Sequence, residues 1–386
     1  LNMFIRSRGV LSHKFLHQAV LLLNLCAITV ALNGFSDNLN LHSTSPQYID
    51  LHVHTAGLGS DSNGIFISPK LKESYKFSFY LQAFGVRDED LNEHSDRLIL
   101  SKIAKSIRES IHLKQAVILA LDGVIDDNGN LDYARTQIYI PNDFLINELP
   151  GHPELLFGAS INPYRRDALK RLEQVVSNGA VLLKWIPNIM HIDPADPKIA
   201  PFYRRLAEYK LPLLTHAGQE RAFAESNDLF GDPQRLELPL SLGVTVIAAH
   251  IATTGTTEKQ GNFDRLIPMF KKYQNLYADI SSLTQINKLN YLAKALQVPN
   301  LHERLVYGSD WPLQRFPLVS PLYHLNHIGF SNVTSILQIQ NQWDRDVRLK
   351  QALGVPHSVF QRSERLLKSH HTKRKTAEIN EPSLLW

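Results

Sequence analysis

The sequence predicts an α/β protein built as a (β/α)8 barrel. From Gln47 onward, short runs rich in Val, Ile, Leu and Tyr alternate with longer amphipathic stretches, which is the pattern of β/α units. There are eight such runs, and their nearly continuous apolar character is typical of strands that are covered on both faces. Polar residues gather where the runs end, which is where a barrel places its active site. An open doubly wound sheet is the alternative architecture.

The predicted strands are separated by stretches that can hold connecting helices. They span Tyr48 to Val53, Ala116 to Leu121, Leu155 to Ile161, Ala180 to Lys184, Leu211 to Thr215, Val244 to Ala249, Asn275 to Ile280 and Arg304 to Tyr307. Residues 167–177 illustrate a connecting helix, because Leu169, Leu172 and Val175 recur at helical spacing and an Asn-Gly pair follows them.

Composition divides the chain into three regions. We expect residues 1–46 to be an N-terminal leader, residues 47–360 to be the barrel, and residues 361–386 to be a basic polar tail. Residues 56–114 separate the first two strands by far more than the roughly 2 to 6 residues of a usual βα loop. This segment is therefore predicted to be a long insertion after strand 1, with structure of its own or acting as a lid.

The leader contains a largely apolar run at residues 19–32, interrupted by Asn24. It follows a stretch that carries Arg6, Arg8 and Lys14, and its length suits the apolar core of a signal peptide better than a full membrane span. The sequence thus favours export or membrane anchoring over a cytoplasmic location, with an apolar helix packed on the barrel as the alternative.

Composition also excludes several classes of protein. Hydrophobic residues are 44% and charged residues 20% of the chain, which argues against a disordered, fibrous or multi-span membrane protein. The net charge of +4 comes from the two ends, and no basic-aromatic stripe lies between them, so we expect no nucleic-acid partner. Cys26 is the only cysteine, which rules out disulfide frameworks and thiolate metal sites.

Six residues that can carry chemistry stand at or just beyond the ends of predicted strands. They are His52, His54, Lys184, His216, His250 and Asp310. His52 and His54 are two residues apart on strand one, so both side chains point to the same face, which is the inside of a closed barrel. The remaining four follow strands four, five, six and eight.

Imidazole and carboxylate groups without thiolate predict a divalent metal site. Zn²⁺ is the favoured ion, with Mn²⁺, Fe²⁺ and Ni²⁺ as alternatives, and either one or two ions fit the pattern. Such an ion lowers the pKa of bound water and polarises a substrate carbonyl. Asp310 is the expected proton acceptor.

Four segments resemble the amidohydrolase superfamily, and amidohydrolase family 2 in particular. They are Ile49-Asp50-Leu51-His52-Val53-His54, Leu213-Leu214-Thr215-His216-Ala217-Gly218, Val246-Ile247-Ala248-Ala249-His250 and Tyr307-Gly308-Ser309-Asp310-Trp311-Pro312. The resemblance implies a distorted TIM barrel with a mononuclear or binuclear metal centre that performs hydrolysis, or decarboxylation in some branches.

The resemblance also implies a role for each ligand. His52 and His54 would bind the first metal, and Asp310 would bind metal and transfer the proton. In binuclear members His216 and His250 bind a second metal, and a carboxylated lysine, here Lys184, bridges the two ions. In mononuclear members His216 joins the first metal and His250 positions water or substrate. The alternative for Lys184 is a cation that pairs with a substrate carboxylate or a nearby acid.

Further polar and aromatic residues just past strand ends are candidate substrate contacts. They are Trp185, Asn162, Arg165 and Gln219, and Asp279 also lies at a strand end. No G-x-S-x-G motif is present, which disfavours a serine hydrolase.

We therefore expect a metal-dependent hydrolase that uses a metal-bound hydroxide to cleave a C–O or C–N bond of a small-molecule amide, lactone or ester. One alternative is a mononuclear, metal-dependent, non-oxidative decarboxylase, which needs an anion-binding Arg or Lys beside the metal. An alternative of another class is a membrane-tethered, non-catalytic binding protein. The sequence does not predict the oligomeric state.

Overall fold

The computed structural model describes residues 47–59 and 62–367. The leader, with its apolar run at residues 19–32, lies outside the described residues, as does most of the predicted basic tail. Within the described part, no helix is long and apolar enough to cross a membrane.

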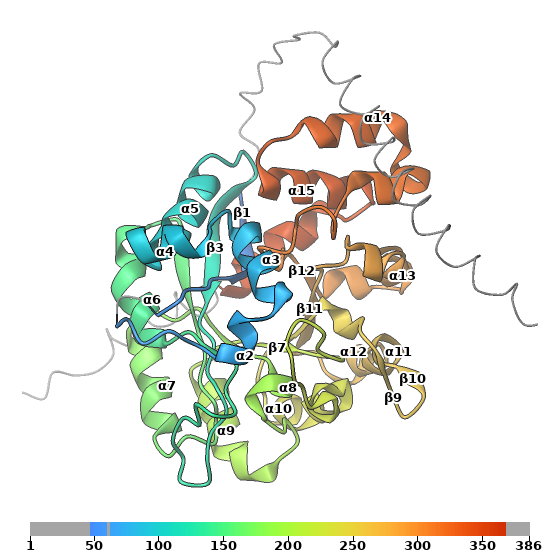
Figure 1. The fold of residues 1–386 in the computed structure, drawn as a ribbon. Coiled ribbons are helices and arrows are strands. Elements are labelled where there is room, and N and C mark those ends of the chain that lie inside the picture. The colour runs from blue at the N-terminus through green and yellow to red at the C-terminus, as the bar shows by residue number, and fades with distance from the viewer. Residues whose placement is uncertain (1–46, 60–61, 368–386) are drawn as a thin grey trace, which may run out of the picture.

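The centre of the molecule is one eight-stranded parallel sheet (Figure 1). Its strands, in sheet order, are β1 (Tyr48–His54), β3 (Leu113–Leu119), β5 (Leu155–Ala159), β6 (Leu182–Trp185), β7 (Leu213–His216), β8 (Val246–Ala249), β11 (Leu276–Asp279) and β12 (Leu305–Val306). Each of them overlaps one of the eight strands predicted from the sequence.

The chain after β12 returns to β1 and brings the two ends of the sheet together. The backbone N–H of Asp310 donates to the carbonyl of His52 at 2.9 Å, and that of His54 donates to the carbonyl of Trp311 at 3.0 Å. A parallel bridge joins Val53 and Trp311. The predicted α/β TIM barrel is therefore confirmed, and the doubly wound sheet is not observed.

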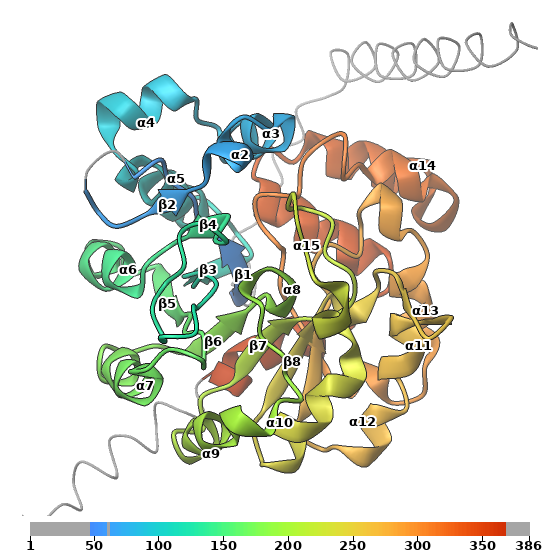
Figure 2. The same cartoon turned by 60° about the horizontal axis from the view of Figure 1, so that its bottom comes forward.

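Helices surround the sheet on its outer side (Figures 1 and 2). The labelled α-helices are α2 (Pro69–Lys72), α3 (Tyr75–Phe84), α4 (Asp88–His94), α5 (Arg97–Arg108), α6 (Asn142–Glu148), α7 (Ala168–Ser177), α8 (Pro187–Met190), α9 (Ala200–Glu208), α10 (Glu237–Ser241), α11 (Asn262–Leu266), α12 (Met269–Lys272), α13 (Tyr291–Gln297), α14 (Leu325–Gln338) and α15 (Gln342–Ala352). Residues 357–367 are helical as well. On α7, Leu172 and Val175 are buried, as the helical spacing predicted, whereas Leu169 is exposed.

Short elements complete the fold. The 3₁₀ helices are η1 (Leu149–Gly151), η2 (Pro197–Ile199), η3 (Asp228–Gly231), η4 (Pro233–Leu236), η5 (His250–Ala252), η6 (Ile286–Lys288), η7 (Leu301–Glu303) and η8 (Pro321–His324). Two antiparallel pairs join β2 (Phe66–Ile67) to β4 (Ile138–Tyr139) and β9 (Thr256–Thr257) to β10 (Gln260–Gly261).

The segment between β1 and β3 contains β2 and the helices α2 to α5. Helix α5 packs beside β3, and it buries Ile99, Ile103 and Ile107 at helical spacing. Ser74 caps the N-terminus of α3, because its hydroxyl accepts the Phe77 backbone N–H. Helices α2 and α3 lie over the end of the barrel where the strands terminate (Figure 2).

The barrel interior is filled by apolar side chains below the strand ends. Leu182 and Leu214 belong to this inner cluster, together with Val117, Ile247 and Val306. Lys184 lies two residues beyond Leu182, and His216 two beyond Leu214, so these polar side chains face the same interior from a higher layer. The apolar layer thus supports the polar site from beneath.

Candidate metal centre

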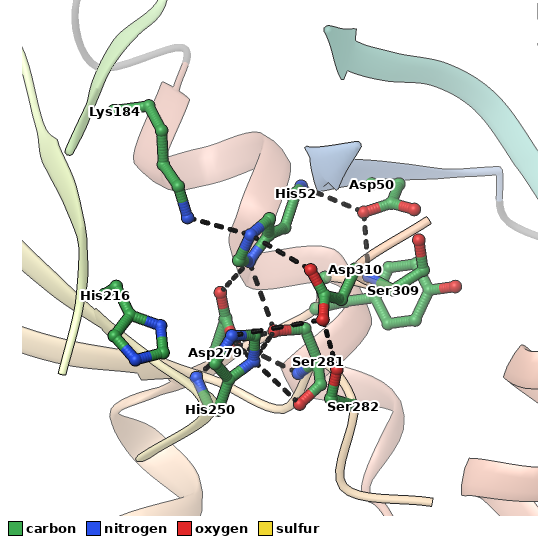
Figure 3. A network of polar contacts seen from close by, with 12 residues as sticks. Asp50, His52, Lys184, His216, His250, Asp279, Ser281, Ser282, Ser309 and Asp310 are labelled. Carbon is green, nitrogen blue, oxygen red and sulfur yellow. Dashed lines mark hydrogen bonds and ion pairs between the residues drawn. The ribbon is translucent and has the colours of Figure 1, made fainter. Parts of the chain in front are cut away.

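The six residues predicted to carry the chemistry converge at the C-terminal ends of the strands. His52 and His54 lie on β1, Lys184 on β6 and His216 at the end of β7. His250 directly follows β8, and Asp310 follows β12. All six line one cavity of about 450 Å³. Figure 3 shows Lys184, His52 and Asp310 directed toward one another, with His216 and His250 beside them.

Three of these side chains have the spacing of ligands to a single ion. The Nε2 atoms of His52 and His54 are 3.2 Å apart, and Oδ1 of Asp310 lies 3.5 Å from the first and 3.3 Å from the second. Ligands bound at about 2.0–2.1 Å to a tetrahedral ion stand about 3.3 Å from one another. The donor set and its spacing therefore fit a divalent metal.

Asp279, at the end of β11, holds the ring of His52 and the backbone of His250. Its Oδ2 accepts from Nδ1 of His52 at 2.8 Å, and its Oδ1 accepts the backbone N–H of His250 at 2.9 Å. With the proton held on Nδ1, the lone pair on Nε2 of His52 is free for a metal. The sequence placed Asp279 at a strand end, but no motif indicated this role.

His216 and His250 form the other half of the site. Nδ1 of His216 is 3.5 Å from a carboxylate oxygen of Glu220, and its buried Nε2 has no hydrogen-bond partner among the described residues. Nδ1 of His250 is 2.7 Å from the hydroxyl of Ser281, and its Nε2 is 4.0 Å from Oδ2 of Asp310. A buried ring nitrogen without a partner fits a metal ligand, because leaving it unbound is costly.

The backbone is strained at two of the ligand positions. His250, Ile251 and Ala252 have φ of 55°, 49° and 52°, and Asp310 has φ of 66°. L-residues rarely adopt this left-handed region, least of all a β-branched residue, and each such residue costs on the order of 1–3 kcal/mol. The surrounding structure thus holds the chain in conformations that present these ligands.

Burial sets the protonation states that metal ligands require. It lowers the pKa of His52 to about 4, and it also lowers the pKa values of His216 and His250, so all three are neutral at pH 7. Burial opposes ionisation of Asp310, but the adjacent His250 and His54 outweigh it and hold the pKa of that carboxyl well below its usual range. Neutral imidazoles and an ionised carboxylate can bind a metal without losing protons first.

Lys184 is buried beside the first group of ligands. Its Nζ lies 2.9 Å from Nε2 of His52, and only 1% of the residue is exposed. Burial lowers the pKa of Lys184 to about 8. About a tenth of this amine is therefore neutral at pH 7, far more than for an ordinary lysine.

The candidate substrate residues fall into two groups. Gln219 lines the cavity, whereas Trp185, Asn162 and Arg165 are not among the lining residues. Trp185 is fully buried, and its indole N–H donates to the carbonyl of Ile161 at 2.7 Å.

Asn162 and Arg165 are also engaged within the fold. The amide of Asn162 donates to the carbonyls of Gly123 and Met190 at 2.9 and 2.8 Å. Arg165 makes a bidentate pair with Asp122 at 2.7 and 2.6 Å. These positions give no support to the prediction that Trp185, Asn162 and Arg165 contact substrate, because their polar groups already have partners in the protein.

Two features of the cavity were not predicted from the sequence. One is Lys288, a buried lysine in η6 that carries no recognisable motif. The other is an apolar wall provided by α2 and α3, formed by Leu71, Phe77, Tyr80, Leu81 and Phe84. Only the unusual length of the segment after strand one signalled that it has structure of its own.

Comparison of the sequence with known families and with curated proteins gives two findings. The sequence model of the amidohydrolase family matches residues 111–322, which is more than half of the chain. No curated protein matches the sequence.

Several solved structures are similar in fold. An uncharacterized TIM-barrel protein from Bordetella bronchiseptica has a TM-score of 0.52 at 14% identity, covering 84% of this chain and 99% of that one. A protein from Pseudomonas putida provisionally named 2-pyrone-4,6-dicarboxylic acid hydrolase has a TM-score of 0.47 at 15% identity, with coverages of 83% and 97%. A manganese complex of 5-carboxyvanillate decarboxylase from Novosphingobium aromaticivorans has a TM-score of 0.46 at 12% identity, with coverages of 87% and 100%.

Proposed function

Because the chain belongs to the amidohydrolase family, we propose that this metal-dependent enzyme cleaves a C–O or C–N bond at a carbonyl carbon of a small molecule, such as an ester, lactone or amide. The observation that carries the proposal is the mutual spacing of the donor atoms of His52, His54 and Asp310, which suits one ion. We propose Zn²⁺ as that ion, since two imidazoles and a carboxylate are ligands that it favours. When bound, it lowers the pKa of water and polarises a carbonyl group.

Asp310 is the residue that we propose to move the proton. Its Oδ1 faces His52 and His54, whereas its Oδ2 accepts from the hydroxyl of Ser282 and lies 4.0 Å from Nε2 of His250. Oδ2 is therefore the atom placed to take a proton from the attacking water and return it to the leaving group. Ser282 and His250 hold that oxygen in position.

Lys184 is proposed to become a carbamate and so complete a site for a second ion with His216 and His250. In this reaction the neutral amine adds to CO₂, an N–C bond forms, and one proton is released. The burial of Nζ next to His52 supports the proposal, because the product would place carboxylate oxygens among the ligands. Intact mass measured under non-acidic conditions should show one CO₂ per chain, and this adduct should be lost in Lys184→Met.

Non-oxidative decarboxylation is the second candidate reaction. It requires a cation that binds the substrate carboxylate beside the metal, and Lys288 provides one in the same cavity. In that reaction the C–CO₂ bond breaks, CO₂ leaves and a proton takes its place on carbon; Asp310 would first take this proton from water and then deliver it from Oδ2.

A turnover screen tests the proposed reaction. The metal-loaded protein would be assayed with aryl esters, lactones, amides and aromatic carboxylic acids. General acid–base groups contribute about 10²–10⁴-fold to rates, so Asp310→Asn should lower kcat by that factor. The matched control Asp264→Asn removes an exposed carboxylate that pairs with Lys294, and it should leave kcat unchanged.

The screen also separates the two reactions. Hydrolysis of an ester, lactone or amide that depends on Asp310 supports the first proposal. Release of CO₂ from a carboxylic acid, with no hydrolysis, would support decarboxylation instead. Equal turnover by Asp310→Asn and wild type would contradict both.

A further inference from the structure

Lys288 is a buried lysine on the wall of the cavity. It ends the short helix η6, only 6% of the residue is exposed, and it lines the same cavity as the metal ligands. Within residues 47–59 and 62–367 its ammonium group has no hydrogen bond or ion pair. An ammonium group has three donors, and those of Lys288 are left for water or a bound molecule in the cavity.

Lys288 shares its cavity with acidic residues and with the proposed metal ligands. Burial lowers the pKa of Lys288, and Asp310 and Glu220 oppose that shift by favouring the charged form. Because Lys288, Glu220 and the six proposed ligands line one cavity, a single bound molecule can contact both the ammonium group and the metal centre.

The other basic side chains on the cavity wall already have partners in the described structure. Nζ of Lys76 donates to the carbonyls of Arg221 and Phe223 at 2.9 and 3.2 Å. The guanidinium of Arg221 donates to the side chain of Gln219, and Lys184 contacts His52. Lys288 is therefore the lysine on this wall that remains available to a bound molecule.

The part of the cavity formed by α2, α3 and β3 is suited to a hydrocarbon group. Helices α2 and α3 contribute Leu71, Phe77, Leu81 and Phe84, all buried, and β3 contributes Leu119. Tyr80 adds a ring whose hydroxyl is already used, because it donates to the carbonyl of Ala222 at 3.0 Å. A volume of about 450 Å³ is in the range of small-molecule sites.

Resting on the proposed function, we propose that the substrate is an amphipathic carboxylate whose anionic group is bound by Lys288 and whose apolar body lies against the wall formed by α2 and α3. The reacting carbonyl would then lie between these two contacts, at the metal ligands. Sugars and other polyhydroxylated molecules are disfavoured, because this wall offers them few hydrogen-bonding groups.

Calorimetric binding of a matched pair of probes tests the inference without turnover. Phenylbutyrate and phenylbutyramide share an apolar body and differ in charge. The metal-loaded wild type should bind the acid roughly tenfold or more tightly than the amide, as expected for a charge-assisted hydrogen bond. Lys288→Met should lose this preference and keep its affinity for the amide, whereas Lys288→Arg should retain it.

Two controls separate the Lys288 contact from other causes. Lys76→Met removes a cavity lysine that is already hydrogen-bonded, and it should leave the preference for the acid unchanged. Repeating the titrations after chelation shows whether the acid binds only to the metal. If Lys288→Met misfolds by circular dichroism, Lys288→Gln takes its place.

The outcomes distinguish this inference from the proposed function. If the preference depends on Lys288 but the turnover screen is negative, the anion subsite stands and the proposed hydrolase activity fails. If neutral esters are hydrolysed and the acid preference is absent, or is unchanged in Lys288→Met, the hydrolase stands and the inference is overturned.

Discussion

Replacing Asp279 by Asn should weaken metal binding although Asp279 is not itself one of the proposed ligands. Its carboxylate accepts from Nδ1 of His52 at 2.8 Å, and both side chains are fully buried. Removing this charge destabilises the tautomer that presents Nε2 to the metal. Losing such a partner of a histidine ligand typically costs 10–100-fold in metal affinity, or about 1.4–2.7 kcal/mol.

The affinity would be measured by competition with a chromophoric chelator, on protein shown to be folded by circular dichroism. Asp346→Asn is the matched control, because Asp346 is also buried and bonds to Lys350 at 2.7 Å and Tyr307 at 2.9 Å, outside the cavity lining. Both variants should lose stability, but only Asp279→Asn should lose metal affinity. Equal affinities in Asp279→Asn and wild type would refute the proposed role of Asp279.

Three further predictions concern stability. Burial lowers the pKa of His112, so on acidification the unfolded chain binds a proton more readily than the folded protein does. The free energy of unfolding should therefore fall as the pH drops through about 6.5, the pKa of a histidine in the unfolded chain. His112→Phe should therefore reduce the loss of unfolding free energy between pH 7 and pH 5, and an unchanged loss would contradict this. Arg165→Met leaves Asp122 buried without its partner and should lower the free energy of unfolding by about 3–5 kcal/mol, measured by chemical denaturation. The KM should stay unchanged, and a raised KM would support Arg165 as a substrate contact. Chelation should lower Tm, because metal at a hundred times its Kd stabilises the folded state by about 2.7 kcal/mol, and a Tm insensitive to chelation would argue against a structural contribution of the metal.

The architecture and the ligands were accessible from the sequence for a physical reason. Strands covered on both faces are apolar throughout, so a histidine or aspartate at the end of such a run stands out, as His216 and Asp310 do. The two-residue spacing of His52 and His54 fixes a shared face irrespective of tertiary detail.

The support of the ligands and the shape of the cavity could not be predicted in the same way. Asp279 contacts a residue 227 positions away, and no local pattern encodes that distance. The position of Lys288 depends on how the chain turns after β11. The pairing of Arg165 with Asp122 could not be predicted either, because Asp122 follows a different strand and no local pattern links the two residues.

The central claim is that His52, His54 and Asp310 hold a catalytic divalent ion, and metal content per folded chain tests it most directly. Wild-type protein purified without chelator and supplied with Zn²⁺ or Mn²⁺ should retain at least one ion per chain, whereas the double variant His54→Asn, Asp310→Asn should retain far less. Wild-type protein without bound metal, or equal retention by the folded double variant, would contradict the account.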